Sequence, residues 1–338
     1  MIYKKFLDLE LSEIGIGTYL GNPDIQTDKN YEEAIKTAIE LGVNVIDTAI
    51  NYRNMRSERV IGKVIKNYDR KNLVISTKGG YFPIDADLNI TDITKYLKEN
   101  FIDTGIISKE DITPYGNIIS PKYIDWSFEK SLENLNTDYI DIYFLHNPED
   151  QLQIIDKEKF YRKLWATFRL LEGKIKENKL RYYGIATWNG LRAKPTDKQY
   201  LNLKEIYDIA VEVGGENHHF RFIQLPYNVA MTEAYSLKNQ EGNLSVLELS
   251  KKLNIYVYTS ATLFQGRVIR QLPDITKQIF KVEKDIHVPI QFVRSTPNIG
   301  TALIGMSKKE HVIENLEIEK YPKLTPEEFE ALFEKAKK

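Results

Sequence analysis

Eight short apolar runs, separated by segments with helical spacing, are the feature that most restricts the fold of this chain. Each run is apolar on both faces, which is typical of a parallel strand that is covered by helices. Alternation of such strands with helices predicts an α/β fold. The apolar runs are residues 13–17, 43–49, 72–78, 139–146, 181–187, 221–228, 254–261 and 298–305, and helical spacing occurs at 30–42, 57–68, 120–135, 158–179 and 243–253.

The number of strands favours a closed (β/α)8 barrel, the TIM-barrel architecture. An open doubly wound sheet is the alternative, but its Gly-rich dinucleotide fingerprint is absent, and "GIGTYLG" at 15–21 resembles that fingerprint only superficially. Residues 1–15 indicate a β-hairpin before the first barrel strand, and the connection at 79–118, after the third strand, is too long for an ordinary loop. No internal boundary stands out, so we expect one domain over residues 1–338.

The charge balance argues against nucleic-acid and membrane partners. The chain has 47 basic and 48 acidic residues and a formal net charge of -1, with no long block of one sign. No uncharged run reaches the roughly 18 residues of a membrane-spanning helix. The chain has no cysteine, and its five histidines lack the spacing of a zinc site. We therefore expect a cytoplasmic protein without a metal site that acts on a small molecule; the sequence gives no indication of its oligomeric state.

Four titratable side chains follow three successive predicted strands. The strand predicted in the second run ends at Asp47 and Tyr52 lies in the loop after it, while Lys78 and His146 end the third and fourth runs. In a TIM barrel the carboxyl ends of the strands surround one site, so these side chains should meet. Taken singly, Asp47 could cap a turn, Lys78 could reach solvent, and His146 could be a hydrogen-bonded structural residue.

Together, the four residue types suit proton transfer to a carbonyl oxygen. A phenol titrates near pH 10, and a nearby ammonium stabilises the phenolate, so we expect Lys78 to lower the pKa of Tyr52. Asp47 would keep the lysine protonated and oriented. His146 would donate a hydrogen bond to the substrate oxygen and hold it against Tyr52.

The same residues lie in motifs that resemble the aldo-keto reductase superfamily. The resemblance covers nearly the whole chain, from "GIGTYLG" through "VIDTAINY", "VISTKGG", "DIYFLHNP", "EGKIKENKLRYYGIAT" and "FIQLPYN" to "ALIGMSKKEHVIENL". It implies a (β/α)8 barrel that transfers hydride between a nicotinamide cofactor and a carbonyl or alcohol. It also implies a catalytic tetrad, with Tyr52 as the general acid of reduction, that consists of Asp47, Tyr52, Lys78 and His146.

The resemblance further implies contacts to the nicotinamide and pyrophosphate of the cofactor. Gln224 matches a glutamine that bonds the carboxamide, although it could instead satisfy backbone groups, and Tyr227 matches an aromatic residue that stacks on the ring. A serine–asparagine pair common in the family appears here as Ala186 and Thr187, so Thr187 is the polar contact expected there. A loop at 259–267 corresponds to the loop over the pyrophosphate, with Ser260, Leu263 and Gly266 as contacts.

The segment "GMSKKEHVIEN" (305–315) resembles the part of the family that binds the adenosine phosphate. His311 stands where many members have arginine, and Gly305 where they have a phosphate-binding lysine. Ser307 with Glu310 also fits the capping box of an ordinary surface helix, which is the alternative. NADP(H) is the expected cofactor and NAD(H) the alternative. The helix amides and these residues are the expected contacts: Gly305, Ser307, Lys308, His311, Glu314 and Asn315.

Two functions of different classes fit these features. The first is an NADP(H)-dependent oxidoreductase that reduces an aldehyde or ketone to an alcohol, with Tyr52 as the proton donor. The second is a cofactor-binding regulatory partner or sensor that resembles the channel-associated members of the superfamily. Some of those members keep the tetrad, so the sequence alone leaves both functions open. The physiological substrate depends on loop shapes that the sequence does not define.

Overall fold

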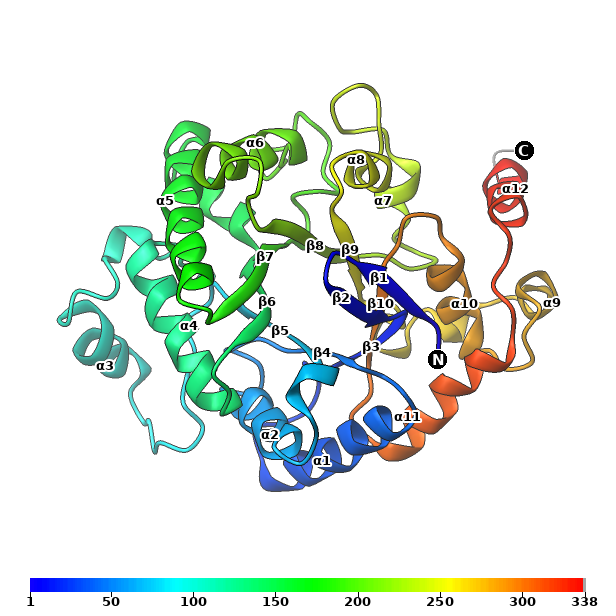
Figure 1. Ribbon diagram of the computed structural model, residues 1–338, viewed down its shortest axis with the longest axis horizontal. Coiled ribbons are helices and arrows are strands. Elements are labelled where there is room, and N and C mark those ends of the chain that lie inside the picture. Colours follow the sequence, from blue (N-terminus) through cyan, green and yellow to red (C-terminus); the bar gives the residue numbers. More distant parts are fainter. Residues whose placement is uncertain (337–338) are drawn as a thin grey trace.

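The computed structural model describes residues 1–336 and contains a closed barrel of eight parallel strands (Figure 1). The strands follow one another around the barrel in chain order, and the last pairs with the first. The (β/α)8 TIM barrel is therefore confirmed, and the open doubly wound sheet is wrong. The strands are β3 (Ile14–Gly17), β4 (Val45–Asp47), β5 (Val74–Gly79), β6 (Ile140–His146), β7 (Leu180–Ala186), β8 (Phe220–Pro226), β9 (Tyr256–Ser260) and β10 (Thr301–Gly305).

Helices surround the barrel on its outside (Figure 1). The first of them begins earlier than the apolar spacing predicts, because the Asp24 carboxylate accepts the Thr27 amide and caps it. No helix within residues 1–336 is long and apolar enough to cross a membrane. The helices are α1 (Ile25–Glu40), α2 (Arg56–Ile65), α3 (Ile93–Leu97), α4 (Pro121–Leu135), α5 (Lys157–Lys176), α6 (Leu203–Gly214), α7 (Glu233–Ser236), α8 (Val246–Lys252), α9 (Ile275–Phe280), α10 (His287–Ser295), α11 (Lys309–Leu316) and α12 (Pro326–Ala336).

The amino-terminal end of the barrel is closed by the predicted hairpin, β1 (Tyr3–Phe6) and β2 (Leu9–Ser12). Leu9 and Leu11 join the apolar side chains that fill the barrel interior, and Lys4 Nζ donates to the carbonyls of residues 299 and 300 at 2.8 and 2.7 Å. The interior is packed with side chains, as in other TIM barrels, so a ligand site can open only at the carboxyl ends of the strands. The interior residues are Val45, Val74, Ile142, Phe144, Ala186, Phe222, Tyr256, Tyr258 and Leu303.

The long connection after β5 packs against the outer wall of the barrel. Its two ends pair at Tyr81 and Asn117, and the chain between them makes an excursion that includes α3. Asp85 forms an ion pair with Arg59 of α2 at 2.7 Å, and the Phe101 ring packs edge-on against a tryptophan of α4. The excursion is therefore an ordered insert over α2 and α4. The expected single domain also included Lys337 and Lys338, which lie outside the described residues.

Gly184 on β7 provides a test of how tightly the barrel strands pack. A Cβ at Gly184 would lie 1.8 Å from the carbonyl oxygen of Phe222 on the neighbouring strand. We expect Gly184→Ala to lower the free energy of unfolding by about 3 kcal/mol, because it forces paired strands apart. A Cβ at Gly173 in α5 meets nothing within 4 Å, so Gly173→Ala is the matched control and should raise stability by about 0.5–1 kcal/mol. Urea unfolding measures both; a Gly184→Ala protein as stable as the parent would contradict this packing.

Candidate active site

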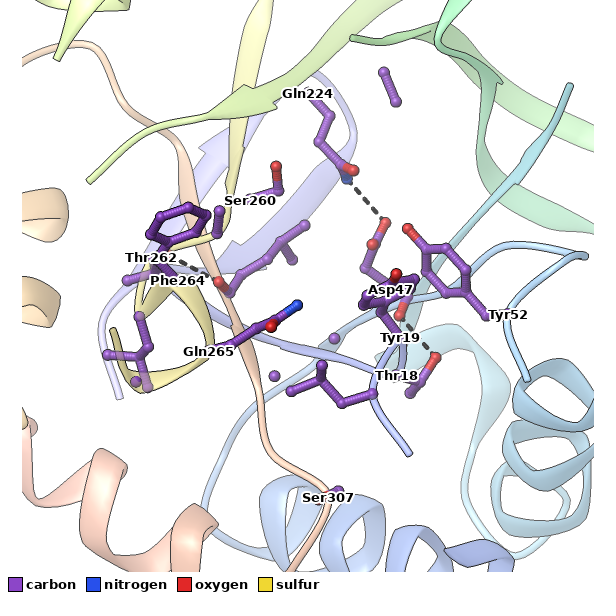
Figure 2. Close-up of a pocket in the computed structure, with 18 of the residues that line it drawn as sticks. Thr18, Tyr19, Asp47, Tyr52, Gln224, Ser260, Thr262, Phe264, Gln265 and Ser307 are labelled. Atoms are coloured by element: carbon purple, nitrogen blue, oxygen red, sulfur yellow. Dashed lines mark hydrogen bonds between the residues drawn. The ribbon is translucent and has the colours of Figure 1, made fainter. Parts of the chain in front are cut away.

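A cleft of about 750 Å³ opens at the carboxyl ends of the barrel strands. Figure 2 places Asp47 and Tyr52 together at one part of the cleft, with Gln224 directed at Asp47 and Ser307 well apart from them. The structure thus brings together residues from nearly the whole length of the chain. The expected site residues that line the cleft are Asp47, Tyr52, His146, Thr187, Gln224, Ser260, Leu263, Gly266, Gly305, Ser307, His311, Glu314 and Asn315.

A buried ion pair lies at the base of the cleft. Lys78 Nζ donates to Asp47 Oδ2 at 2.6 Å and to the Thr48 carbonyl at 2.7 Å, and the Lys78 and Asp47 side chains are 0% and 6% exposed. The other Asp47 oxygen accepts from Ser76 Oγ at 2.7 Å and Gln224 Nε2 at 3.0 Å. Pairing of β4 with β5 sets Asp47 beside Ser76, and Lys78 follows on the same face. Burial lowers the pKa of Lys78, and the Asp47 carboxylate opposes that decrease.

The loop after β4 fixes the position of Tyr52. The Tyr52 amide donates to the carbonyl of Ala49. The Arg53 guanidinium is buried and donates to the Asn22 carbonyl at 2.9 Å and to the Asp28 carboxylate at 2.5 Å, which ties the loop to the start of α1. Left-handed backbone then reverses the chain into α2, with φ values of 49°, 55° and 70° at Arg53, Asn54 and Met55. The phenol is therefore presented to the cleft by an anchored turn.

Tyr52 lies between the ion pair and His146. Lys78 Nζ is 4.9 Å from the centroid of the Tyr52 ring, and the His146 ring centroid is 5.8 Å away. Desolvation and the negative charge of Asp47 raise the pKa of Tyr52 well above its usual value, so the expected decrease is wrong. The physical reason is that Asp47 pairs with the ammonium, leaving the phenol in poorly hydrated surroundings without a free positive charge. Tyr52 therefore remains protonated and can donate when a bound carbonyl oxygen gains negative charge.

His146 is a neutral hydrogen-bonding group in this site. Burial and the positive charge of Lys78 lower the pKa of His146 well below its usual value. Its Nδ1 has no partner among residues 1–336, and its ring lies edge-on to Tyr52 and to Tyr81. A neutral imidazole carries one N–H donor, so His146 can orient an oxygen at neutral pH without itself supplying the proton.

The remainder of the cleft suits a nicotinamide dinucleotide. Thr187 Oγ1 is buried without a partner in the described chain, and the Thr187 amide donates to the Gln224 carbonyl at 2.8 Å. At Gly266 the backbone has a φ of 77° and an added Cβ would meet no atom within 4 Å. Ser307 precedes α11, whose start has no side-chain capping bond, so the capping-box alternative is wrong. An unpartnered hydroxyl, an open glycine loop and a helix N-terminus fit the amide and phosphate groups of such a cofactor.

Two expected cofactor contacts do not lie in the cleft lining. The Tyr227 ring is fully buried, stacks on Phe292 at a centroid distance of 5.3 Å and accepts a hydrogen bond from Thr296. A ring enclosed in this way cannot stack on nicotinamide, so the expectation for Tyr227 is corrected. The reason is the two-residue period of a strand: Tyr227 lies three residues after Gln224 and faces the opposite side, where it packs on α10. Lys308 is the exposed N-cap residue of α11, outside the lining itself.

The sequence did not single out the aromatic walls of the cleft. Tyr19 is 59% exposed at the cleft and packs edge-on against Tyr52 at 5.0 Å. Tyr81 and Trp188 also line the cleft. Each follows the end of a predicted strand, after "ISTKGG" and "GIAT", and this position could have identified them from the sequence. These rings limit the shape of any substrate that reaches Tyr52 and His146.

Comparison with known proteins agrees with this geometry. The sequence model of the Aldo/keto reductase family matches residues 13–268. The uncharacterized oxidoreductase YqkF of Bacillus subtilis is 26% identical over 337 residues, which cover 96% of this chain and 92% of that protein. A putative voltage-gated potassium channel subunit beta of Schizosaccharomyces pombe is 25% identical over 346 residues, covering 94% and 88%. The crystal structure of an aldo-keto reductase from Klebsiella pneumoniae in complex with NADPH has the same fold, with a TM-score of 0.62, 20% identity, and coverage of 98% and 94%.

The electrostatics of Tyr52 and His146 predict that proton donation at this site is insensitive to pH around neutrality. Because the pKa of Tyr52 is raised, the acid stays protonated as the pH rises, and because the pKa of His146 is lowered, the imidazole stays neutral as the pH falls. We expect kcat for reduction to stay within about 2-fold between about pH 6.5 and 9. Initial rates at saturating cofactor and carbonyl compound measure it. A fall in kcat with a midpoint between about pH 7 and 8.5 would contradict Tyr52 as a proton donor with a raised pKa.

Proposed function

The chain belongs to the aldo/keto reductase family, and from this premise we propose that it is an oxidoreductase that uses NADP(H) to reduce an aldehyde or ketone to an alcohol. The observation that supports the proposal most is the contact between Tyr52 and a buried Asp47–Lys78 ion pair, 2.6 Å in length, at a cleft that can hold a dinucleotide. A desolvated, protonated phenol beside such a pair is suited to donate a proton to a bound carbonyl oxygen. NAD(H) is the alternative cofactor.

In this proposal the bound cofactor supplies the hydride, and the protein supplies position and a proton. Gln224 and Thr187 would hold the carboxamide, because both residues line the cleft and Thr187 Oγ1 is buried without a partner among residues 1–336. His146 would donate its N–H to the carbonyl oxygen and orient it. Tyr52 would then transfer its hydroxyl proton to the oxygen as the oxygen becomes negative, and the aromatic walls would exclude water.

A second candidate function is binding of a reduced cofactor as a regulatory subunit. It is favoured by the similarity to the putative channel subunit beta of Schizosaccharomyces pombe described above. The two functions differ in turnover, because a reductase consumes reduced cofactor when a carbonyl compound is added and a sensor only binds it. Oxidation of NADPH and of NADH with a panel of aldehydes, ketones and sugars separates them and also identifies the substrate class.

Tyr52→Phe should abolish most turnover and keep cofactor binding. The substitution removes the proton donor and preserves the ring, so we expect the rate of carbonyl reduction to fall by about 100-fold or more while the Kd of NADPH stays within about 3-fold. Tyr115→Phe is the matched control, because Tyr115 is 71% exposed on the insert and outside the cleft lining. Steady-state rates and fluorescence titration with NADPH make the comparison. Reduction at the parent rate by Tyr52→Phe would show that another group donates the proton.

His311 should contribute to the preference for NADPH over NADH. His311, Glu314 and Asn315 lie on one face of α11 and line the cleft. An imidazole N–H can donate a hydrogen bond to a 2′-phosphate, which NADH lacks, so we expect His311→Ala to lower the preference for NADPH by about 3-fold or more. The dissociation constants of both cofactors, for the parent and for His311→Ala, measure the effect. A ratio of the two constants that the substitution leaves unchanged removes His311 from the phosphate site.

A further inference from the structure

Glu149 is a buried carboxyl group that the proposed reduction does not use. It lies in the short helix Pro148–Gln153, three residues after His146. Its Oε1 accepts three consecutive backbone N–H groups, from Trp188 at 2.8 Å, Asn189 at 2.9 Å and Gly190 at 3.1 Å. Its Oε2 is buried and has no partner within residues 1–336. The carboxylate therefore binds a loop of another strand and not a charged side chain.

The loop that Glu149 holds contributes directly to the cleft. It runs from residue 187 to residue 202, between β7 and α6, and contains no α-helix of its own. Its first two residues, Thr187 and Trp188, line the cleft, and the Trp188 side chain is 43% exposed there. A loop of this length needs fixed points to hold one conformation. The three amides bound to Glu149 begin at Trp188 itself.

The contact between the two segments is closely fitted. A Cβ at Gly190 would lie only 3.2 Å from Glu149 Cβ, so the absence of a side chain at Gly190 permits the approach. A second bond joins the same segments, because Gln199 Nε2 donates to Asp150 Oδ1 at 3.0 Å. Next to these contacts, β6 and β7 pair with His146 opposite Ala186, and the two strands lie side by side in Figure 1. The loop is thus fastened to the chain segment that follows the histidine.

Retention of this carboxyl group has an energetic cost. Burial raises the pKa of Glu149 to about 7, and the backbone N–H groups oppose the increase. An apolar side chain would avoid the cost of burying a charge, but it would leave three amides without their acceptor, and the bond from Gly190 is buried. The cost of the buried carboxyl group is explained if the protein needs the three amides held in one position.

We infer that Glu149 is a positioning residue that fixes Trp188 and Thr187 relative to His146. Trp188 forms a wall of the site for the carbonyl compound, and Thr187 offers its hydroxyl to the cofactor amide. Loss of the acceptor would let both move away from the reacting groups without removing any group that reacts. The inference rests on the proposed reductase function for its kinetic consequence, while its structural consequence can be measured without any turnover.

The test compares Glu149→Ala with the isosteric Glu149→Gln, which keeps a carbonyl oxygen acceptor and removes the charge. For Glu149→Ala we expect the amides of residues 188–190 to exchange hydrogen at least about 10-fold faster, measured by mass spectrometry of peptides. We also expect the KM for the carbonyl compound reduced fastest by the parent to rise about 10-fold with kcat within about 3-fold. Glu149→Gln should return both quantities to within about 3-fold of the parent. If Glu149→Ala does not fold, Glu149→Asp replaces it, because it withdraws the acceptor by one methylene.

Glu172→Gln is the matched control. Glu172 in α5 is also a buried carboxylate that accepts a backbone amide, at 2.8 Å from His219, which directly precedes β8 at the opposite end of the barrel. It should change neither exchange at 188–190 nor KM. Unchanged exchange in Glu149→Ala, or equal losses in Glu149→Ala and Glu172→Gln, would overturn the inference. If the parent reduces no carbonyl compound, the proposed function fails, and amide exchange together with the Kd of NADPH still decides whether Glu149 fixes the loop.

Discussion

The buried ion pair between Asp47 and Lys78 is the interaction on which the site depends. Taking two charges out of water is costly, and the cost is offset here because Asp47 also accepts bonds from Ser76 and Gln224 while Lys78 donates to a backbone carbonyl. These partners come from β4, β5 and β8, so the full set of bonds around the pair forms only when these strands meet in the barrel. Gln224 lies at once against Asp47 and in the lining of the cleft. The group expected to bind the cofactor is therefore in direct contact with the group that controls the charge near Tyr52.

The packing of the barrel also restricts a ligand site to one end. The hairpin and the packed interior close the amino-terminal end, and the insert at 79–118 packs over α2 and α4. The cleft at the opposite end is lined mainly by short segments that follow the strands. Those segments are held individually: Arg53 anchors the loop of Tyr52, and Glu149 binds the loop of Trp188. Rigid strands with separately anchored loops keep the proposed proton donor, the proposed orienting imidazole and an aromatic wall at fixed distances.

Much of this could be predicted from the sequence, since strand ends and chain order are local signals. Asp47, Lys78 and His146 each end an apolar run, and parallel strands in a closed barrel must bring those ends together. What could not be predicted depends on contacts between distant segments. The raised pKa of Tyr52 results from desolvation and from the negative charge of Asp47, and the extent of burial is not visible in a motif. Tyr227 was wrongly expected in the cleft because it lies three residues after Gln224 and faces the other side of the strand. The role of Glu149 appears only when residues 149 and 188–190 are seen in contact.

Transfer of hydride to a carbonyl group, as opposed to binding of the cofactor alone, is what distinguishes the two proposed functions. The most direct measurement uses NADPH in which deuterium replaces both hydrogens at C4 of the nicotinamide, with an aldehyde and the purified protein, and analyses the alcohol by mass spectrometry. Hydride transfer predicts an alcohol that is heavier by one mass unit, formed in proportion to cofactor oxidised, and almost none of it with Tyr52→Phe. Tight binding of NADPH without formation of any deuterium-labelled alcohol, across aldehydes and ketones, would contradict the proposed reductase and leave a cofactor-binding partner as the function.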